Sequence, residues 1–332
     1  MYKDMKRLFA FLSFVLLLAG CKGSGTLLPN VSGKAGEVLI VMDKANWEGN
    51  LGNDVRDLLA SDCPYLAQRE PLYSLVNVIP TGFVDLFKVH RNIVIFNIDQ
   101  QVAEPGIQYL SDAWAAPQCL IQVSAADAAQ ASELVRANGK TIAAYIEQAE
   151  RDRIIRNAIR YEEGSLAPQV AEIFGGSPRF PSGYKLKKKT GDFVWIADEK
   201  QYTMQGVFVY RYPVDDESPF EVDKIIAHRN QVLMANVPGM FENTYMTTGE
   251  FMEPTVEYIR FRGREFTQTR GLWEVENDYM GGPFVSHSFY SPDGKDIIVV
   301  EGFVYAPRYD KRQYLRQVES IVYSWEWKNE EK

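Results

Sequence analysis

The chain has 332 residues, of which 46% are hydrophobic and 13% aromatic, so it can bury a substantial core and does not belong to the disordered class. Its net charge is −8, with 44 acidic residues against 36 basic ones. Proteins that bind nucleic acid need a basic face to neutralise phosphates, so no nucleic-acid partner is expected.

The N-terminal segment has the pattern of a secretory signal peptide at residues 1–20. Basic residues open it, and an apolar run follows at residues 8–19. That run is shorter than the roughly 20 residues that a membrane-spanning helix needs. It ends in Leu18-Ala19-Gly20-Cys21, which matches the bacterial lipobox, whose cysteine is acylated and becomes the mature N-terminus. We therefore expect Cys21 to carry a lipid anchor with fatty chains such as palmitate, which hold because each buried methylene contributes about 0.8 kcal/mol.

Residues 21–36 follow as a stretch rich in Gly, Ser and Lys, without a periodic pattern. We expect a lipidated, flexible tether there. Lys22 stands where an acidic residue commonly retains Gram-negative lipoproteins at the inner membrane, so lysine favours the outer membrane. The membrane is thus the expected partner of the N-terminus, with the folded body facing the periplasm.

The folded body is expected to form two α+β domains, at 37–165 and 184–332, joined by a Pro- and Gly-rich linker at 166–183. Asn138-Gly139 is expected to end one helix and begin the next. Asp293-Gly294 predicts a type I′ hairpin turn, in which both residues have positive φ. The expected strands lie at 37–42, 72–79, 93–98, 106–112, 118–123, 193–197, 206–212, 255–261, 269–276, 285–290 and 297–305. The expected helices lie at 54–60, 81–90, 124–138, 140–161, 219–228 and 310–325.

The two halves share a local sequence echo. Residues 84–94 align without a gap on residues 222–232, and six of the eleven positions are identical. We interpret the echo as an internal duplication of a β-β-α-β-β-β-α unit, against chance similarity between two amphipathic helices. It predicts two similar, α/β-sandwich-like domains with mainly antiparallel sheets flanked by helices.

Several stretches of the first half carry a family resemblance, namely Gly33–Asp43, Trp47–Gly49, Gln68–Pro71 and Lys88–Ile93. They resemble a family of Bacteroidota lipoproteins known as domain of unknown function 4837, and the resemblance extends over essentially the whole mature chain. It implies a Gram-negative envelope location and assigns no catalytic or binding residue. From Pro181-Ser182-Gly183-Tyr184 onwards, the second half also resembles the PsbP/Mog1 type of α-β-α sandwich. This resemblance implies a fold and no chemical activity.

Two triplets, His90-Arg91-Asn92 and His228-Arg229-Asn230, are the sharpest polar features of the echo. They could line a shared cleft and bind an anion or a polar ligand. Alternatively, each closes a short helix, because His and Arg favour the negative C-terminal end and Asn readily adopts the left-handed conformation after it.

Enzymatic signatures are sparse. His90, His228 and His287 are the only histidines and none belongs to a ligand pair or an H-E-x-x-H motif, so neither a metal nor another cofactor is expected. No G-x-S-x-G nucleophile elbow occurs. The remaining route to catalysis is a pair of carboxylates, Asp43 and Asp198, at matching strand ends and facing an inter-domain cleft.

Other features leave alternatives open. Cys63 and Cys119 could form a disulfide in an oxidising periplasm or remain buried thiols. The lysine-rich stretch 185–189 could touch anionic lipid or glycan, or could blunt an edge strand against aggregation. Residues 237–254 hold aromatic and methionine side chains in a loop-rich section and are the preferred contact surface, with a loop packed on its own core as the alternative.

The sequence therefore predicts a lipid-anchored lipoprotein of the cell envelope that binds or scaffolds other components, with an envelope protein or a glycan as partner. The main alternative is a hydrolase of envelope polymers with its site between the domains. A third hypothesis, carriage of a small ligand or lipid, would require a sizeable apolar pocket.

Overall fold

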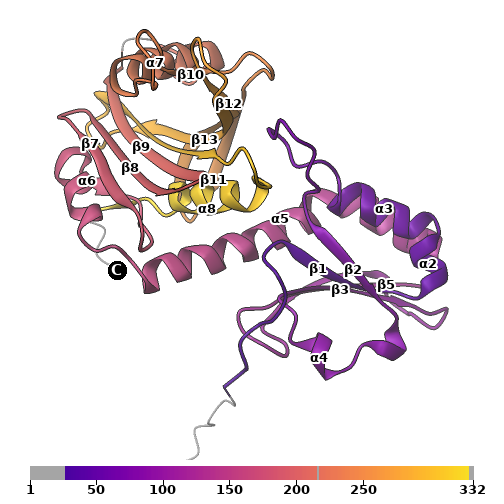
Figure 1. Cartoon of the computed structure of the whole chain (residues 1–332). Coiled ribbons are helices and arrows are strands. Elements are labelled where there is room, and N and C mark those ends of the chain that lie inside the picture. The colour runs from indigo at the N-terminus through magenta and orange to yellow at the C-terminus, as the bar shows by residue number, and fades with distance from the viewer. Residues whose placement is uncertain (1–26, 215–216, 329–332) are drawn as a thin grey trace, which may run out of the picture.

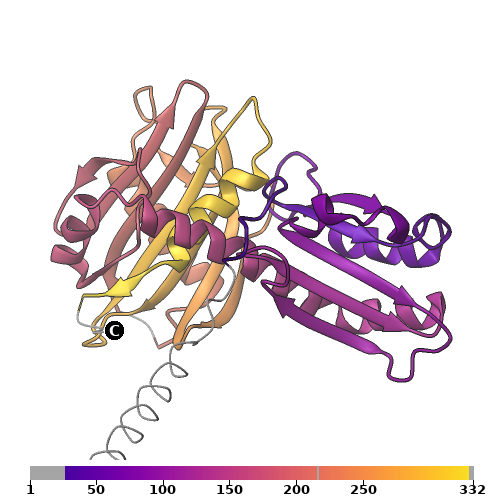
Figure 2. The ribbon, with the colours of Figure 1, turned by 90° about the horizontal axis from the view of Figure 1, so that it is seen from below.

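The computed structural model describes residues 27–214 and 217–328 (Figures 1 and 2). The expected signal peptide at 1–20 and the expected lipidation site Cys21 therefore lie outside the described residues. Within these ranges no helix combines the length and the apolar character that a membrane span requires. The chain forms two α+β domains that lie side by side.

The first domain is built on a 5-stranded sheet in the order β2-β1-β3-β5-β4. Strands β1, β2, β3 and β5 run parallel to one another, and only the edge strand β4 is antiparallel. Near-continuous apolar runs suit parallel strands, because helices cover both faces of such a sheet. The strands are β1 (Glu37–Val41), β2 (Ser74–Val78), β3 (Asn92–Ile98), β4 (Gly106–Ser111) and β5 (Cys119–Ala125).

Helices cover the two faces of this sheet unequally. The short α2 (Lys44–Glu48) is followed by α3 (Asn50–Leu59), which packs with the long helix α5 (Ala128–Arg160) over one face. The other face carries a smaller apolar cluster, with Phe83 and Phe87 near the 3₁₀ turn η1 (Pro80–Gly82) and α4 (Asp85–Lys88).

Helix α5 is continuous, so the predicted break at Asn138-Gly139 is wrong. The Asn138 side chain donates to the carbonyl oxygen of Leu134 within the helix. A Cβ atom on Gly139 would lie 3.0 Å from a methyl carbon of Leu58, so this glycine lets α3 approach α5 closely. Figures 1 and 2 show α5 running from the first domain to the second.

The second domain is a curled half-barrel built on an 8-stranded antiparallel sheet in the order β10-β12-β13-β14-β9-β8-β7, with β11 also paired to β12 (Figure 1). Each strand pair in it is antiparallel. The strands are β7 (Lys185–Lys189), β8 (Phe193–Lys200), β9 (Thr203–Pro213), β10 (Met246–Thr248), β11 (Thr255–Phe261), β12 (Arg264–Val275), β13 (Gly281–Tyr290) and β14 (Asp296–Tyr305).

Both faces of the half-barrel are covered. Helix α7 (Val222–Asn236) packs over one face. Helices α6 (Leu166–Phe174) and α8 (Arg312–Tyr323) pack over the other. The segment 166–183 holds α6 and the strand β6 (Gly176–Ser177), which pairs with β15 (Glu326–Trp327) after α8.

The two domains thus differ in sheet type, which overturns the prediction of two similar domains with mainly antiparallel sheets. A duplicated unit would keep its strand directions, whereas the first sheet is mostly parallel and the second antiparallel. The sequence echo also falls on unlike elements. Residues 85–92 form a short helix and the start of β3, whereas residues 222–236 form one long helix. The internal duplication is therefore wrong.

The hairpin between β13 and β14 also differs in detail from the prediction. Gly294 has a φ of +72°, but Asp293 is not among the residues with positive φ. The Gly294 N–H donates to the carbonyl oxygen of Ser291, and the Asp293 carboxylate accepts from the Ser291 hydroxyl. The turn is therefore not of type I′.

Candidate functional site

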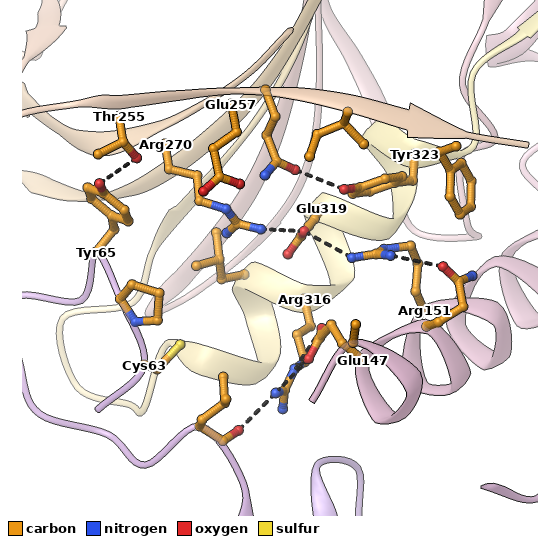
Figure 3. Close-up of a pocket in the computed structure, with 18 of the residues that line it drawn as sticks. Cys63, Tyr65, Glu147, Arg151, Thr255, Glu257, Arg270, Arg316, Glu319 and Tyr323 are labelled. Carbon is orange, nitrogen blue, oxygen red and sulfur yellow. Dashed lines mark hydrogen bonds and ion pairs between the residues drawn. The ribbon is translucent and has the colours of Figure 1, made fainter. Parts of the chain in front are cut away.

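A cavity of about 630 Å³ lies at the junction of the two domains (Figure 3). Its wall is formed by the loop after α3, by the middle of α5, by β11 and β12, and by α8. Arginines outnumber glutamates in this wall, although acidic residues dominate the chain as a whole. The charged lining residues are Arg151, Arg260, Arg270, Arg312, Arg316, Glu147, Glu257 and Glu319.

The loop after α3 reaches the second domain through the stretch Gln68–Pro71. The buried Glu70 carboxylate accepts hydrogen bonds from the backbone N–H of Lys311, at 2.6 Å, and of Arg312, at 2.9 Å. The Gln68 side-chain oxygen accepts from Lys311 Nζ at 2.7 Å. The first N–H groups of a helix have no partner within the helix, so Glu70 caps α8 from the other domain. This cap fixes one wall of the cavity.

Glu147 of α5 and Arg316 of α8 form the second link between the domains. Arg316 donates to the Glu147 carboxylate at 3.0 and 3.2 Å, and the Tyr73 hydroxyl donates to the same carboxylate at 2.6 Å. Burial alone would raise the pKa of Glu147, but the charge of Arg316 and these hydrogen bonds lower it below its ordinary value. Glu147 is therefore a charged hydrogen-bond acceptor and not a proton donor at neutral pH.

Glu319 of α8 forms the third link. Its carboxylate accepts from Arg270 of β12 and from Arg151 of α5, the latter at 3.4 Å. The Arg151 guanidinium also lies 3.8 Å from the ring centroid of Tyr323, a cation–π contact. Figure 3 shows Glu319 between the two arginines. One carboxylate thus shares its charge between two guanidinium groups.

Arg312 has no such compensation. Its guanidinium donates to the carbonyl oxygen of Pro71 and to the Ser74 hydroxyl, and in 27–214 and 217–328 no carboxylate oxygen lies within 4.0 Å of it. Burial and the nearby charge of Arg316 lower the pKa of Arg312 from its ordinary value. Arg312 Nε and Arg316 Nη1 are both buried and have no hydrogen-bond partner among the residues that the structure describes. The wall therefore carries an excess of positive charge, and two of its guanidinium nitrogens are buried without a hydrogen-bond partner among the described residues.

This arrangement suits recognition of an anion. A guanidinium group donates two parallel hydrogen bonds to a carboxylate or a phosphate, and such charge-assisted bonds are stronger in a partly buried site. The one thiol in the wall, Cys63, is a poor nucleophile, because burial raises its pKa to about 11. The cavity therefore has the means to bind an anionic group and lacks an activated thiolate.

The first triplet lies in the first domain and not at this cavity. The triplet follows the short helix α4 and Asn92 begins β3, as predicted, but Asn92 is not among the residues with positive φ, so the left-handed conformation predicted for it is wrong. Its side chain donates to the Glu150 carboxylate of α5 at 2.7 Å, and Arg91 donates to the same carboxylate at 3.0 Å. His90 Nε2 lies 2.8 Å from a Glu37 carboxylate oxygen. These contacts fix the start of β3 against α5.

The second triplet lies inside α7, so the capping interpretation is wrong there too. Arg229 is fully buried and donates to both oxygens of Glu301, at 2.7 and 2.8 Å. The Asn230 side chain accepts from the backbone N–H of Thr248 at 3.0 Å. The His228 ring stacks on Tyr212 with centroids 4.1 Å apart. The two triplets therefore have partners in different domains, and the structure does not bring them together.

Asp43 and Asp198 do not converge either. The Asp43 carboxylate caps α2 by accepting from the backbone N–H of Asn46 at 3.0 Å. Asp198 lies in β8 of the other domain and pairs with Lys200 at 2.9 Å. Each carboxylate thus has its own local partner.

The remaining candidates from the sequence are the two cysteines, the lysine-rich stretch 185–189 and the segment 237–254. Cys63 and Cys119 are free thiols, and burial raises the pKa of Cys119 to about 12. Strand β7, which holds the lysine-rich stretch 185–189, lies at the edge of its sheet. In the loops of 237–254 several apolar side chains are exposed, beside a 330 Å³ cavity with a methionine and aromatic lining. No cluster of three or more potential metal ligands occurs in the described part of the chain.

No local sequence pattern predicts the arginine-lined cavity. Arg151 stands on a helix with a charged outer face, and Arg312 and Arg316 lie in the last helix on either side of Leu315, the first residue of its apolar stripe. Their convergence depends on the path of α5 between the domains. The stretch Gln68–Pro71 carried part of the family resemblance, and it is the one sequence feature that pointed towards this region. Its polar residues cap α8 and bind Lys311.

Two family matches divide the chain. Residues 31–158 match "Domain of unknown function (DUF8532)", and residues 163–324 match "Domain of unknown function (DUF4837)". The second family is the one expected, but its match lies in the second half, whereas the quoted stretches at 33–93 lie in the region that matches the other family. No curated protein matches the chain. Among solved structures, the "Human StarD13 (DLC2) lipid transfer and protein localization domain" is similar at 9% sequence identity, over 43% of this chain and 88% of that one, with a TM-score of 0.22. A TM-score this low supports no conclusion about the fold or the function of this chain.

Proposed function

We propose that this two-domain chain is a non-enzymatic binding protein of the cell envelope. Its inter-domain cavity binds a ligand that carries a carboxylate or phosphate group. The observation that carries this proposal is the wall of the 630 Å³ cavity, in which five arginines face three glutamates. Arg312 is central, because it is partly buried and lacks a carboxylate partner among the described residues. An anion placed there would receive charge-assisted hydrogen bonds.

Binding is favoured over hydrolysis of an envelope polymer. A glycosidase-type mechanism needs one carboxylic acid with a raised pKa beside a second carboxylate. Glu147 has a lowered pKa, and Glu319 accepts from two arginines. Asp43 and Asp198 lie in different domains, and each is engaged by a neighbour in its own domain. Glu147 is thus held in its charged form, and the other three carboxylates are engaged by hydrogen bonds or ion pairs, which suits a positioning role.

The envelope location rests on the sequence. The lipobox at Leu18–Cys21 and the tether at 21–36 support a lipid-anchored protein, and Lys22 supports the outer membrane with the body facing the periplasm. Replacing Cys21 by Ser should move the protein from the membrane fraction to the soluble fraction. Mass spectrometry of the mature N-terminal peptide should show an acylated Cys21. An unacylated N-terminus in the wild-type protein would contradict the location.

The binding proposal is tested by isothermal titration calorimetry with inorganic phosphate and with citrate. We expect Arg312→Gln to weaken binding of the recognised anion by about tenfold to a hundredfold, since a hydrogen bond to a charged group contributes about 1.5–3 kcal/mol. The matched control is Arg69→Gln, which removes one positive charge from an exposed position in the loop that contributes to the cavity wall. Equal losses in both variants, or no binding of either anion, would refute the cavity as an anion site.

A further inference from the structure

The 330 Å³ cavity beside residues 237–254 opens at one end of the half-barrel. Helix α7 covers this face of the sheet and ends at Asn236, and the cavity begins just beyond it, at Val237. The ends of paired strands contribute to its wall, among them Met204 of β9 opposite Tyr305 of β14. Ligand sites commonly lie in the mouths of β-barrels, and this half-barrel is left open where α7 ends.

Apolar side chains form the floor and most of the wall of this cavity. Trp273 and Phe303 are only 3% and 2% exposed, and both belong to the apolar core beneath α7. Methionine is the commonest residue type in the lining, and an unbranched, polarizable thioether side chain adapts its shape to an apolar ligand. We call the site the methionine cavity and define it by Met204, Met240, Met246 and Met280.

The charged residues of the lining are Glu199 and Lys200, which are exposed at the end of β8. Each has a partner, because Glu199 pairs with Lys187, and Lys200 pairs with Asp198 at 2.9 Å. Among the described residues, the buried part of the lining holds no charged group. A charged ligand group placed there would lose its hydration without compensation, so the depth of the cavity favours an apolar group.

A hairpin at residues 237–246 forms part of the rim. Its backbone closes on itself, since the Gly239 N–H donates to the carbonyl oxygen of Thr244 at 2.8 Å. Met240 and Phe241 at its tip are 80% and 66% exposed. Exposed apolar side chains grouped beside an apolar cavity are typical of a binding surface, because a folded protein otherwise keeps such groups away from water.

We propose that the methionine cavity binds the alkyl chain of a fatty acid or a lipid. A cavity of about 150 Å³ accommodates one benzene ring, so this one has room for an apolar group of about twice that size, such as a chain of roughly ten carbon atoms. A flexible chain can follow the space between the methionines, and its head group would stay in water beside Lys200. The methionine cavity is separate from the arginine-lined cavity, so this inference does not depend on anion binding.

The test measures binding of uncharged alkyl alcohols to the full mature chain carrying Cys21→Ser, which has no acyl chain of its own. Titration calorimetry with 1-hexanol, 1-octanol and 1-decanol should show an affinity that rises about threefold to fourfold for each added methylene. The alcohol 11-bromo-1-undecanol should quench tryptophan fluorescence, because Trp195 and Trp273 line the cavity. Decanoate and decanoyl-lysophosphatidylcholine are then compared, and the tighter of the two shows whether a free fatty acid or a membrane lipid is the source of the chain.

Met204→Trp should fill part of the cavity and weaken binding of 1-decanol by about tenfold, because the indole takes the space of roughly two methylenes. Met240→Asp, at an exposed rim position where folding is not at risk, should weaken it by about threefold. The matched control is Met234→Trp, at an exposed methionine of α7 outside the cavity, which should bind 1-decanol like the unsubstituted chain.

Three results would overturn the proposal. The first is no binding of 1-decanol, or an equal affinity for all three alcohols. The second is an unchanged affinity for 1-decanol in both Met204→Trp and Met240→Asp. The third is binding of toluene without binding of 1-decanol, which would indicate a site for an aromatic ring instead of an alkyl chain.

Discussion

Breaking the ion pair between Arg229 and Glu301 by a single substitution should be among the most destabilising changes in the second domain. Both side chains are completely buried, and two hydrogen bonds of 2.7 and 2.8 Å join them. Arg229 also donates to the Thr248 hydroxyl and lies 3.8 Å from the centroid of the Phe284 ring. Replacing Glu301 by Gln would leave a guanidinium charge without its counter-ion in an apolar interior, and arginine cannot lose its proton to avoid this.

Breaking a buried pair in this way costs about 3–5 kcal/mol, a large share of the roughly 5–15 kcal/mol that stabilises a typical domain. We expect Glu301→Gln to lose about that much free energy of unfolding. Arg229→Met should lose less, because the remaining carboxyl can take up a proton. The double variant Arg229→Met/Glu301→Leu should recover most of the loss, since no charge is then left buried. Urea unfolding followed by far-UV circular dichroism measures all three.

The reasoning would be refuted by a loss below 1 kcal/mol for Glu301→Gln, or by a double variant less stable than either single one. A small loss would show that the pair is accessible to water. It would also restore Arg229 as a candidate ligand-binding residue.

Three further predictions concern the junction and the thiols. Glu70→Ala should cost about 0.5–2 kcal/mol of unfolding free energy, because α8 loses its cap, and limited proteolysis should cut the loop after α3 faster. In the native protein Cys63 and Cys119, with pKa values raised to about 11 and 12, should react with iodoacetamide at pH 8 far more slowly than in urea. Glu147 has a lowered pKa, so its stabilising effect is present above its unfolded value near 4.5 and is lost as the pH falls through its folded value. Wild-type protein should therefore lose stability more steeply than Glu147→Gln below pH 4.5, and parallel pH profiles would contradict this.

The positions of many elements could be predicted from hydrophobic patterns. The expected strand at 37–42 matches β1, the strand at 255–261 matches β11, and the last helix lies within its expected range. The antiparallel strand direction predicted for both sheets is confirmed in the second domain and wrong in the first, although the first half carried a signal for parallel strands. The unbroken apolar runs of β1 and β3 are typical of parallel strands covered on both faces.

Other errors came from giving local residue chemistry too much weight. Asn138-Gly139 has the composition of a helix end, but the glycine serves the close approach of Leu58. The two His-Arg-Asn triplets share residue types and bind Glu150 and Glu301 respectively, in unlike environments. Identity at a few positions therefore did not reflect a shared fold.

The arginine-lined cavity could not be predicted because its residues come from distant parts of the chain. Arg151, Arg270 and Glu319 meet only when α5, β12 and α8 pack together. No spacing rule relates such positions in sequence. The packing of α5 between the domains, which brings them together, is a tertiary property.

The most direct test of the account is to locate an anion in crystals of the protein soaked with tungstate, by anomalous diffraction from tungsten. The account predicts a tungstate in the inter-domain cavity, within hydrogen-bonding distance of the Arg312 guanidinium, and no such peak in crystals of Arg312→Gln. An empty cavity in the wild-type crystals, or a peak that persists unchanged in the variant, would contradict the claim that this cavity recognises anions.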